Sequence, residues 1–260
     1  MSVADRGLAS ADPWEGKHAP RASGARLPAV LDQPLSDLVR VVVLDLLVMV
    51  LSLSVHECAH AWVAYRLGDD TAERQGRLSL SPVTHVDPIG SLLIPALNIV
   101  IAGGFGFIGW ARPTPVTPSK FRPTVPMRAG MALVAAAGPI SNLLLALVSL
   151  GLFAIFKRAD VGLWDAAGRA TGVAALLAAM FQVNVGLMVF NFLPIPPLDG
   201  SRLLPRSMDE FKEAIAPYSF VLLLLIINVR FLRDNVVSGP IHLVMNALQS
   251  LFQTQIGFAS

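Results

Sequence analysis

The sequence predicts an all-α membrane protein that crosses the bilayer several times. Hydrophobic residues make up 54% of the 260-residue chain and charged residues only 15%, with a mean hydropathy of +0.61. Soluble domains carry about 25% charged residues, so this composition is typical of a membrane protein. Three strong apolar runs have the length that a membrane-crossing helix needs, at about residues 38–65, 129–156 and 171–193.

The segments around these runs carry weaker signals. Residues 1–35 contain no apolar stretch of the signal-peptide type and are rich in Ala, Pro, Gly and charge, so we expect a disordered tail. The alternating stretch 76–82 predicts a short strand that ends at a proline. Residues 89–110 are apolar but interrupted by Pro95, Gly103, Gly104, Gly106 and Gly109, which weakens a helix prediction. We therefore expect a small membrane-associated β or re-entrant region here.

Two final segments, at about 214–232 and 236–253, are near or below the roughly 20 residues that a straight crossing needs. We expect them to be helices that flank the three-helix core. The net charge is only +2, and no basic cluster is interleaved with aromatic residues. Nucleic acid is therefore not an expected partner.

The strongest chemical signal is the motif His56-Glu57-Cys58-Ala59-His60, inside the first apolar run. Positions i and i+4 share one face of a helix, so His56 and His60 can hold one metal ion. Glu57 is then placed to act as a general base. Because imidazole and carboxylate groups are costly in hydrocarbon, they need a partner or a task there. The ligand types predict zinc, and iron or cobalt would suit the same ligands.

A catalytic zinc site usually has three protein ligands, and the best candidate for the third is Asp199. It follows the third apolar run after the proline-broken stretch Pro194-Ile195-Pro196-Pro197. Proline removes backbone donors and turns the chain, and irregular backbone at membrane depth is tolerated only inside protein or beside water. Such a helix end, followed by an aspartate, is typical of the wall of an active site.

Binding of one ion by His56, His60 and Asp199 would constrain the topology. The first and third apolar runs must then end on the same side, and the chain between residues 60 and 129 must cross an even number of times. The loops on that side, 66–88, 111–128 and 198–213, hold ten basic residues against five in the opposite loops. The positive-inside rule therefore favours a cytoplasmic site in a multi-pass protein of the cell membrane.

Three stretches resemble the signatures of the site-2 protease family of intramembrane zinc metalloproteases. They are the His56–His60 motif, Ala137-Gly138-Pro139 with Asn142, and the stretch from Asn191 to Gly200. The resemblance covers about residues 38–205. Leu67-Gly68-Asp69-Asp70-Thr71 and His85-Val86-Asp87-Pro88 are similar to the short prokaryotic branch, which has no PDZ or CBS domain. The resemblance implies one intramembrane metalloprotease domain over residues 36–253.

The resemblance also implies the roles of individual residues. It implies a Zn²⁺ ion held by His56, His60 and Asp199, with Glu57 as the catalytic base. It assigns Asn142 to the substrate or the oxyanion, and Asn191 and Pro194 to presentation of the substrate. The expected substrate is a transmembrane protein within the lipid bilayer. Because no PDZ or CBS region is evident, we expect a regulatory subunit or a homo-oligomer to provide control.

Structural alternatives stand beside several of these assignments. Asn142 would equally serve close helix packing through Gly138, and Asn191 and Pro194 would equally serve only to end a helix. His85 and Asp87 would form either a second metal pair or ordinary loop contacts. Among whole functions, a transporter predicts paired repeats with broken helices, which the sequence lacks. A catalytically inactive relative that acts as a binding scaffold is the remaining alternative, and the intact Glu57 argues against it.

Overall fold

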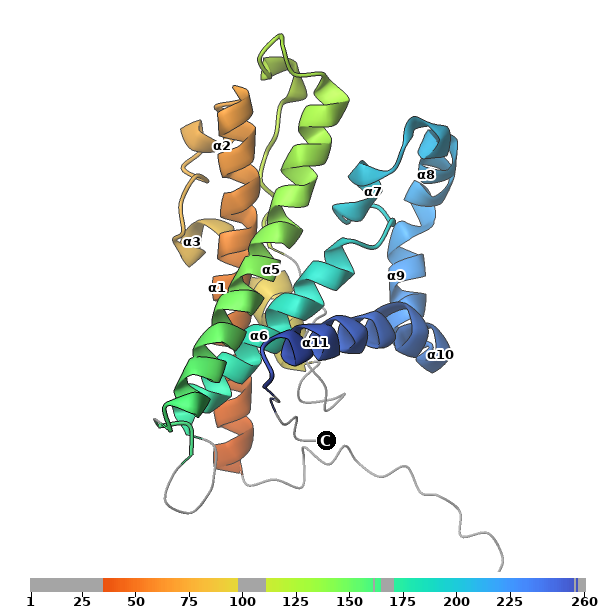
Figure 1. Ribbon diagram of the computed structural model, residues 1–260. Coiled ribbons are helices and arrows are strands. Elements are labelled where there is room, and N and C mark those ends of the chain that lie inside the picture. The colour runs from red at the N-terminus through yellow and green to blue at the C-terminus, as the bar shows by residue number, and fades with distance from the viewer. Residues whose placement is uncertain (1–34, 98–110, 161, 165–170, 255, 257–260) are drawn as a thin grey trace, which may run out of the picture.

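A computed structural model describes residues 35–97, 111–160, 162–164, 171–254 and 256 (Figure 1). Within these residues the regular secondary structure is helical and contains no β-strand, which confirms the all-α class. Three helices are long and apolar enough to cross a membrane, namely α1 (Leu35–Leu67), α5 (Met127–Arg158) and α6 (Gly172–Asn191). Each boundary lies within three residues of the predicted one. The tail predicted at 1–35 falls, except for its last residue, outside the described residues.

The helices α1, α5 and α6 form the core, and α5 packs against both of the others. Figure 1 shows α1 and α6 running in one direction and α5 running in the opposite direction. Apolar side chains of α1, such as Val48, pack against those of α6, such as Val183. Asn184 on α6 donates to Ser52 Oγ on α1 at 2.9 Å, the type of interhelical bond that replaces hydrophobic driving force in lipid.

The connection from α1 to α5 starts and ends on one side of the core, as the topology argument predicts (Figure 1). Its described part contains α2 (Thr71–Arg74), α3 (Pro82–His85), the π-helix η2 (Pro88–Leu93) and the 3-10 helix η3 (Pro118–Lys120). Residues 88–97 together form one short apolar helix. The rest of the stretch predicted to be re-entrant, 98–110, lies outside the described residues.

The strand expected at residues 76–82 is wrong. Local polar contacts replace a strand ladder, since Ser79 Oγ accepts from the backbone N–H of Ser81 at 3.0 Å. The carbonyl of Ser79 pairs with His85 Nε2 at 2.8 Å. A period-two pattern fixes only which side chains alternate, and a strand also needs a neighbouring strand to pair with. None lies among the described residues.

Asp69, directly after α1, joins the two ends of this connection. The buried carboxylate accepts from the backbone N–H of Thr71 at 3.0 Å and from the backbone N–H of Thr117 at 2.5 Å. The N–H of Arg122 donates to the carbonyl of Leu67 at 2.8 Å. The segment before α5 is therefore docked on the end of α1, which holds it beside the motif that α1 carries.

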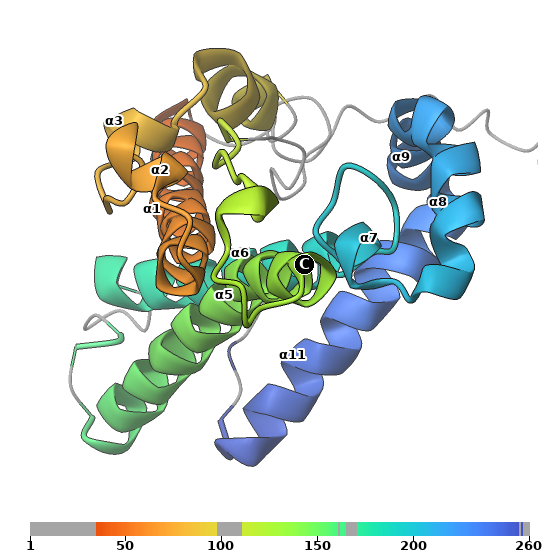
Figure 2. The same cartoon turned by 90° about the horizontal axis from the view of Figure 1, so that it is seen from above.

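The C-terminal part flanks the core on one side (Figure 2). After α7 (Gly200–Leu203) and η4 (Arg206–Met208) come α8 (Asp209–Ile215), η5 (Ala216–Tyr218), α9 (Ser219–Asn228), α10 (Arg230–Leu232), η6 (Arg233–Ser238) and α11 (Gly239–Leu251). The apolar pair 206–228 and 230–251 is bent by 87°, and it counts as a fourth crossing only if the two halves form one span. Phe181 of α6, Ile226 of α9 and Met245 of α11 pack in one apolar cluster.

Candidate metal centre

The two histidines of the motif point their ring nitrogens at each other. His56 and His60 lie one turn apart on α1, and their Nε2 atoms are 3.1 Å apart. Both side chains are buried, and the ring planes meet at 88°. The i, i+4 spacing therefore brings two metal-binding nitrogens to one point, as the sequence predicts.

Asp199 completes this cluster from the other end of the core. Its Oδ2 atom lies 3.2 Å from Nε2 of His56 and 3.2 Å from Nε2 of His60. The structure thus brings together the three predicted ligands, although Asp199 follows His60 by 139 residues in the sequence.

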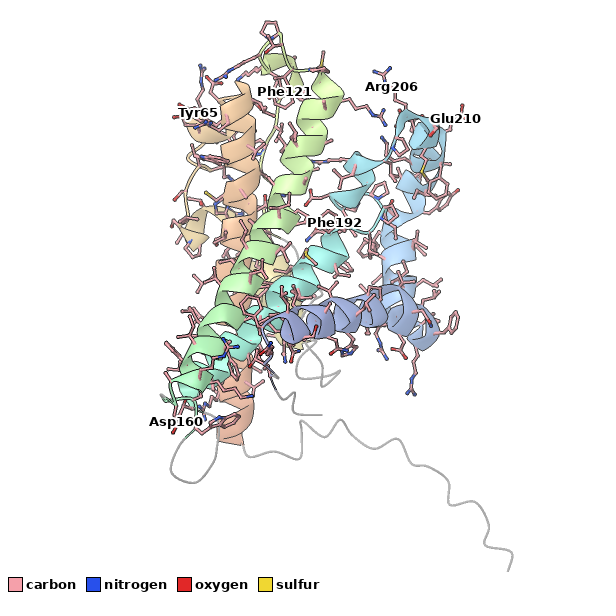
Figure 3. The ribbon with its side chains drawn as sticks, in the orientation of Figure 1. Tyr65, Phe121, Asp160, Phe192, Arg206 and Glu210 are labelled. Atoms are coloured by element: carbon pink, nitrogen blue, oxygen red, sulfur yellow. The ribbon has the colours of Figure 1, made fainter. Side chains whose placement is uncertain are left out.

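Gly200 explains how Asp199 reaches the histidines. A Cβ atom at this position would collide with the backbone of Phe192 and Leu193, at the end of α6. The absence of a side chain lets α7 begin directly against that helix end. Phe192 lies about midway along the molecule, between the end marked by Tyr65 and Arg206 and the end marked by Asp160 (Figure 3). The chain after α6 consequently returns Asp199 to the depth of the histidines.

The second nitrogen of each imidazole is fixed by an oxygen of α5. His60 Nδ1 lies 2.6 Å from the carbonyl oxygen of Val134, and His56 Nδ1 lies 3.0 Å from Oδ1 of Asn142. A carbonyl oxygen only accepts, so His60 donates through Nδ1 and presents a lone pair at Nε2. Asn142 has the same effect on His56 when its amide oxygen faces the ring. Such outer contacts orient the imidazoles that hold a metal.

Three acceptor atoms that converge in this way require a positive charge between them. Two imidazole lone pairs and a carboxylate oxygen repel one another at 3.1 to 3.2 Å. Tetrahedral zinc, with bonds of about 2.0–2.1 Å, separates its ligand atoms by roughly 3.3 Å. The donor set and its spacing therefore fit a zinc ion.

Glu57 lies at the side of this cluster. Its carboxylate is buried and, with one nitrogen from each histidine, forms a group of donor atoms within 4.8 Å of one another. The backbone N–H of Thr114 donates to Glu57 Oε2 at 2.8 Å, and the hydroxyl of Thr114 donates to the carbonyl of Glu57 at 3.0 Å. The segment docked by Asp69 thus holds the carboxylate beside the metal ligands.

Two of these contacts, those of Thr114 and Val134, were not predictable from the sequence. Thr114 lies between two prolines in a stretch without periodicity, and 57 residues separate it from Glu57. The Val134 contact is made by a backbone oxygen, which any residue type would supply. The only local signal for Thr114 is that Pro113 and Pro115 lack donors, so that Thr114 alone among these three residues can offer an N–H to a neighbour.

Other predicted site residues lie elsewhere. Asn191 donates to the carbonyl of Leu187 at 2.9 Å in the last turn of α6, and the exposed Pro194 follows it. Asp87 accepts from the N–H groups of Ile89 and Gly90 at the start of η2. Asp87 caps this helix, and Nε2 of His85 pairs with the carbonyl of Ser79, so both residues make the ordinary loop contacts that the sequence offered as one alternative.

Three apolar helices, with a buried cluster of His, Glu and Asp donors between them, define a metalloprotease embedded in a membrane. The candidate metal ligands and three helices long and apolar enough to cross a bilayer lie together in this structure. Comparison with known proteins gives this class a family.

Residues 151–233 match Peptidase family M50. "Putative zinc metalloprotease YwhC" of Bacillus subtilis is 40% identical over 182 residues, which cover 68% of this chain and 77% of that protein. "Putative zinc metalloprotease Rip2" of Mycolicibacterium smegmatis is 37% identical over 169 residues, 64% of this chain and 58% of that protein. No solved structure matches. The chain belongs to peptidase family M50, the site-2 protease family.

Proposed function

We propose that this chain is an intramembrane zinc endopeptidase that hydrolyses peptide bonds within or near transmembrane segments of other proteins. The observation that carries this proposal is the convergence of Nε2 of His56, Nε2 of His60 and Oδ2 of Asp199 within about 3.2 Å, among helices that cross a membrane. The names of the two relatives, each beginning "Putative zinc metalloprotease", support zinc as the ion. We assign these three residues as its ligands.

The chain's own residues supply the proton transfers. Zinc, when bound, supplies a Lewis acid that polarises the scissile carbonyl and activates a water molecule. Glu57 accepts the proton of the attacking water and passes it to the leaving amine. Thr114 fixes the orientation of this carboxylate through its N–H, which donates to Oε2. Pre-positioning of this kind is needed because a misplacement of about 1 Å costs about 100-fold in rate.

Asn142 has one role toward the metal site and one toward the substrate. Its Oδ1 atom holds His56, and its Nδ2 atom is buried without a hydrogen-bond partner among the described residues. An unpaired buried amide is costly, so a ligand that accepts from it is favoured. We assign this amide to the carbonyl oxygen of the substrate, where it stabilises negative charge as the bond is attacked. Asn191 and Pro194, at the end of α6, are assigned to presentation of the substrate segment.

The site faces the cytoplasmic side of the cell membrane in this proposal. The loops at the ends of α1 and α6 and at the start of α5 carry the excess of basic residues, which the positive-inside rule places in the cytoplasm. His60 lies seven residues before the end of α1, or about 10 Å along the helix axis. A substrate helix would therefore be cut inside the bilayer but near its cytoplasmic surface. Control would come from a regulatory subunit or from a second copy of the chain.

The test combines metal content with cleavage of a model transmembrane peptide by the detergent-purified chain. Glu57→Gln is expected to keep about one zinc per chain and to abolish cleavage, because only the proton acceptor is lost. Asp199→Ala is expected to lose or weaken zinc binding and to abolish cleavage. Undiminished cleavage by Glu57→Gln refutes the mechanism. Wild-type chain that holds neither metal nor activity would instead support the scaffold alternative.

A further inference from the structure

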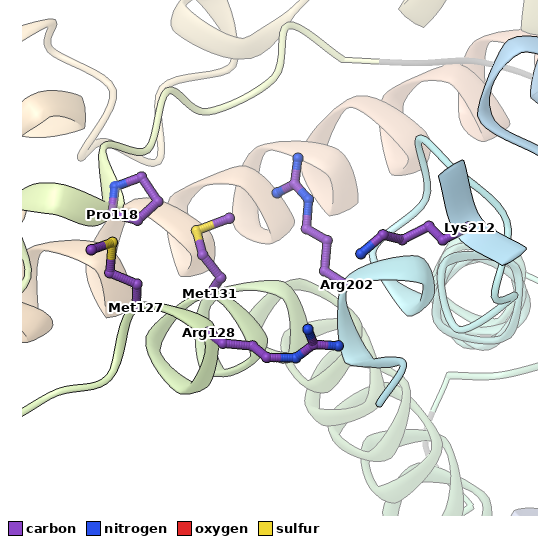
Figure 4. Close-up of a pocket in the computed structure, with 6 residues that line it drawn as sticks. All are labelled: Pro118, Met127, Arg128, Met131, Arg202 and Lys212. Carbon is purple, nitrogen blue, oxygen red and sulfur yellow. The ribbon is translucent and has the colours of Figure 1, made fainter. Parts of the chain in front are cut away.

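A pocket with three cationic side chains opens beside the N-terminal end of α5, on the side of the molecule where α1 ends (Figure 4). Its volume is about 340 Å³. Pro118, Met127 and Met131 form the apolar part of its lining, and the cationic part consists of Arg128, Arg202 and Lys212. The pocket combines an apolar wall with positive charge, which suits an anionic group attached to a larger molecule.

Arg202 is the one of these three cationic residues that forms no ion pair with a described residue. Arg128 donates to Asp209 at 2.7 Å, and Lys212 donates to the same carboxylate at 3.0 Å. Arg202 is exposed, and its side chain has no hydrogen bond or ion pair with any described residue. Three positive charges are therefore balanced by one negative charge, and Arg202 is the group available to a ligand.

The pocket and the metal centre share the same face of α5. Met131 precedes Gly138 by seven residues, which is close to two full turns and about 10 Å along the axis. Gly138 lies directly against the imidazoles, because a Cβ on it would be 2.5 Å from atoms of both His56 and His60. Met131 is thus about 10 Å from Gly138 along the helix axis, and the residues of this face between them, Val134 and Ala135, are buried.

The other two walls also belong to elements of the metal centre. Arg202 lies in α7, three residues after Asp199. Pro118 begins η3, four residues after Thr114, which holds Glu57. Apart from Lys212 on α8, the residues that line the pocket are consequently continuous with segments that position a candidate catalytic or metal-binding group.

A different face of α5 is suited to lipid. Leu133, Ile140 and Leu144 are exposed large hydrophobic residues, and they recur at spacings of seven and four along one side of the helix. At about 100° per residue, this side is turned roughly 160° away from Met131. Acyl chains therefore cover the face opposite to the pocket, and a lipid headgroup is the less favoured ligand.

The geometry points to a substrate subsite in which Arg202 binds an acidic side chain of the protein being cut. Arg202 follows Asp199 by three residues in the chain, and an extended substrate advances about 3.3 Å per residue, so the roughly 10 Å of helix axis from Met131 to Gly138 corresponds to about three substrate residues. The preferred acidic residue would lie two to four residues from the scissile bond, on the side of the substrate that leaves toward the basic loops. This inference rests on the proposed peptidase function and adds to it a sequence preference.

The test uses the full chain with zinc and a single-span peptide in detergent. Asp, Asn or Lys is placed at each of the second to fourth positions on either side of the cleaved bond, and kcat/KM is measured. Wild type is expected to favour Asp over Asn about two- to fivefold at one position, a range set by the weakness of ion pairs at exposed sites. Arg202→Gln should remove this preference, and Arg202→Glu should favour Lys. Arg206→Gln, which removes an exposed arginine outside the pocket, should keep it.

A binding measurement separates recognition from catalysis. The affinity of the Asp and Asn peptides is compared in Glu57→Gln and in Glu57→Gln with Arg202→Gln, and only the first variant is expected to distinguish them. Equal cleavage of all peptides, or an unchanged preference in Arg202→Gln, overturns the subsite and leaves the proposed function intact. Weaker binding of Arg202→Gln to phosphatidylglycerol vesicles, with an unchanged peptide preference, assigns the pocket to a lipid headgroup. Failure to cleave any peptide refutes the proposed function and the subsite with it.

Discussion

Substitution of Gly138 by alanine should remove the metal with almost no change in the chemistry of the chain. The new Cβ would lie 2.5 Å from Cε1 of His56, 2.5 Å from Nε2 of His60 and 2.6 Å from Nε2 of His56. Carbon atoms in contact are normally about 3.5–4.0 Å apart, so the rings must retreat by roughly 1 Å. Metal–ligand distances tolerate only about 0.2 Å. The two nitrogens that would hold the ion are the atoms that must move.

Neither ring has room to retreat without a further loss. His56 is held at Nδ1 by Asn142, and His60 is held at Nδ1 by the carbonyl of Val134. Loss of an outer contact of this kind alone costs about 10- to 100-fold in metal affinity, and displacement of both ligands should cost at least as much. At a free zinc concentration 100 times the Kd of the wild type, bound zinc adds about 2.7 kcal/mol to the free energy of unfolding. The loss of affinity removes up to this amount.

Gly151→Ala is the matched control on the same helix. Its new Cβ would lie 3.5 Å from Cε1 of Phe252, an ordinary contact. Both substitutions replace glycine by alanine within α5, which favours the helix by up to about 1 kcal/mol. The difference in zinc affinity between the two variants therefore isolates the clash with the imidazoles. The assay is zinc content after dialysis, together with the melting temperature with and without added zinc. Wild-type zinc content and an undiminished zinc-dependent rise in melting temperature in Gly138→Ala would refute this account of the site.

Two further substitutions test the outer contacts of the cluster. Asn142→Ala removes the acceptor that orients His56 and should weaken zinc binding about 10- to 100-fold, measured by competition with a chelator; unchanged affinity would leave Asn142 with a substrate role only. Thr114→Pro removes the N–H that holds Glu57 and should lower cleavage about 10- to 100-fold, since a hydrogen bond to a charged group contributes about 1.5–3 kcal/mol, while zinc content stays at the wild-type value. Thr114→Ser keeps both donors and serves as its control, and equal cleavage by the proline variant would show that Glu57 needs no such support.

The three long apolar helices and the cluster of candidate metal ligands were predictable because membranes impose severe constraints. A span must be long and almost free of charge, so α1, α5 and α6 stand out in the sequence. Any ionisable group inside such a span is costly, which singled out His56 and His60. Asp199 stood out because it follows a proline-broken helix end, and binding of one ion by Asp199 and the two histidines would require the chain between α1 and α5 to return to its starting side.

The contacts that orient these ligands were not predictable for a physical reason. Val134 acts through its backbone, which carries no sequence signal. Thr114 meets Glu57 only because Asp69 docks the proline-rich segment on the end of α1, and a contact between distant irregular segments has no periodicity. The strand expected at 76–82 failed because alternation describes one segment alone, whereas a strand depends on a partner.

The position of Asn142 joins these two kinds of information. The sequence left its role open between helix packing and contact with a substrate, and the structure supports a contribution to both the metal site and the reaction. Its oxygen faces His56, while its nitrogen is buried without a partner among the described residues. Packing alone would favour an apolar residue here, because an unpaired amide costs about 1–3 kcal/mol. The unpaired amide of Asn142, beside three converging acceptor atoms, is best explained by a polar ligand that binds during catalysis. The backbone carbonyl of an unwound substrate has the required chemistry, because it accepts a hydrogen bond.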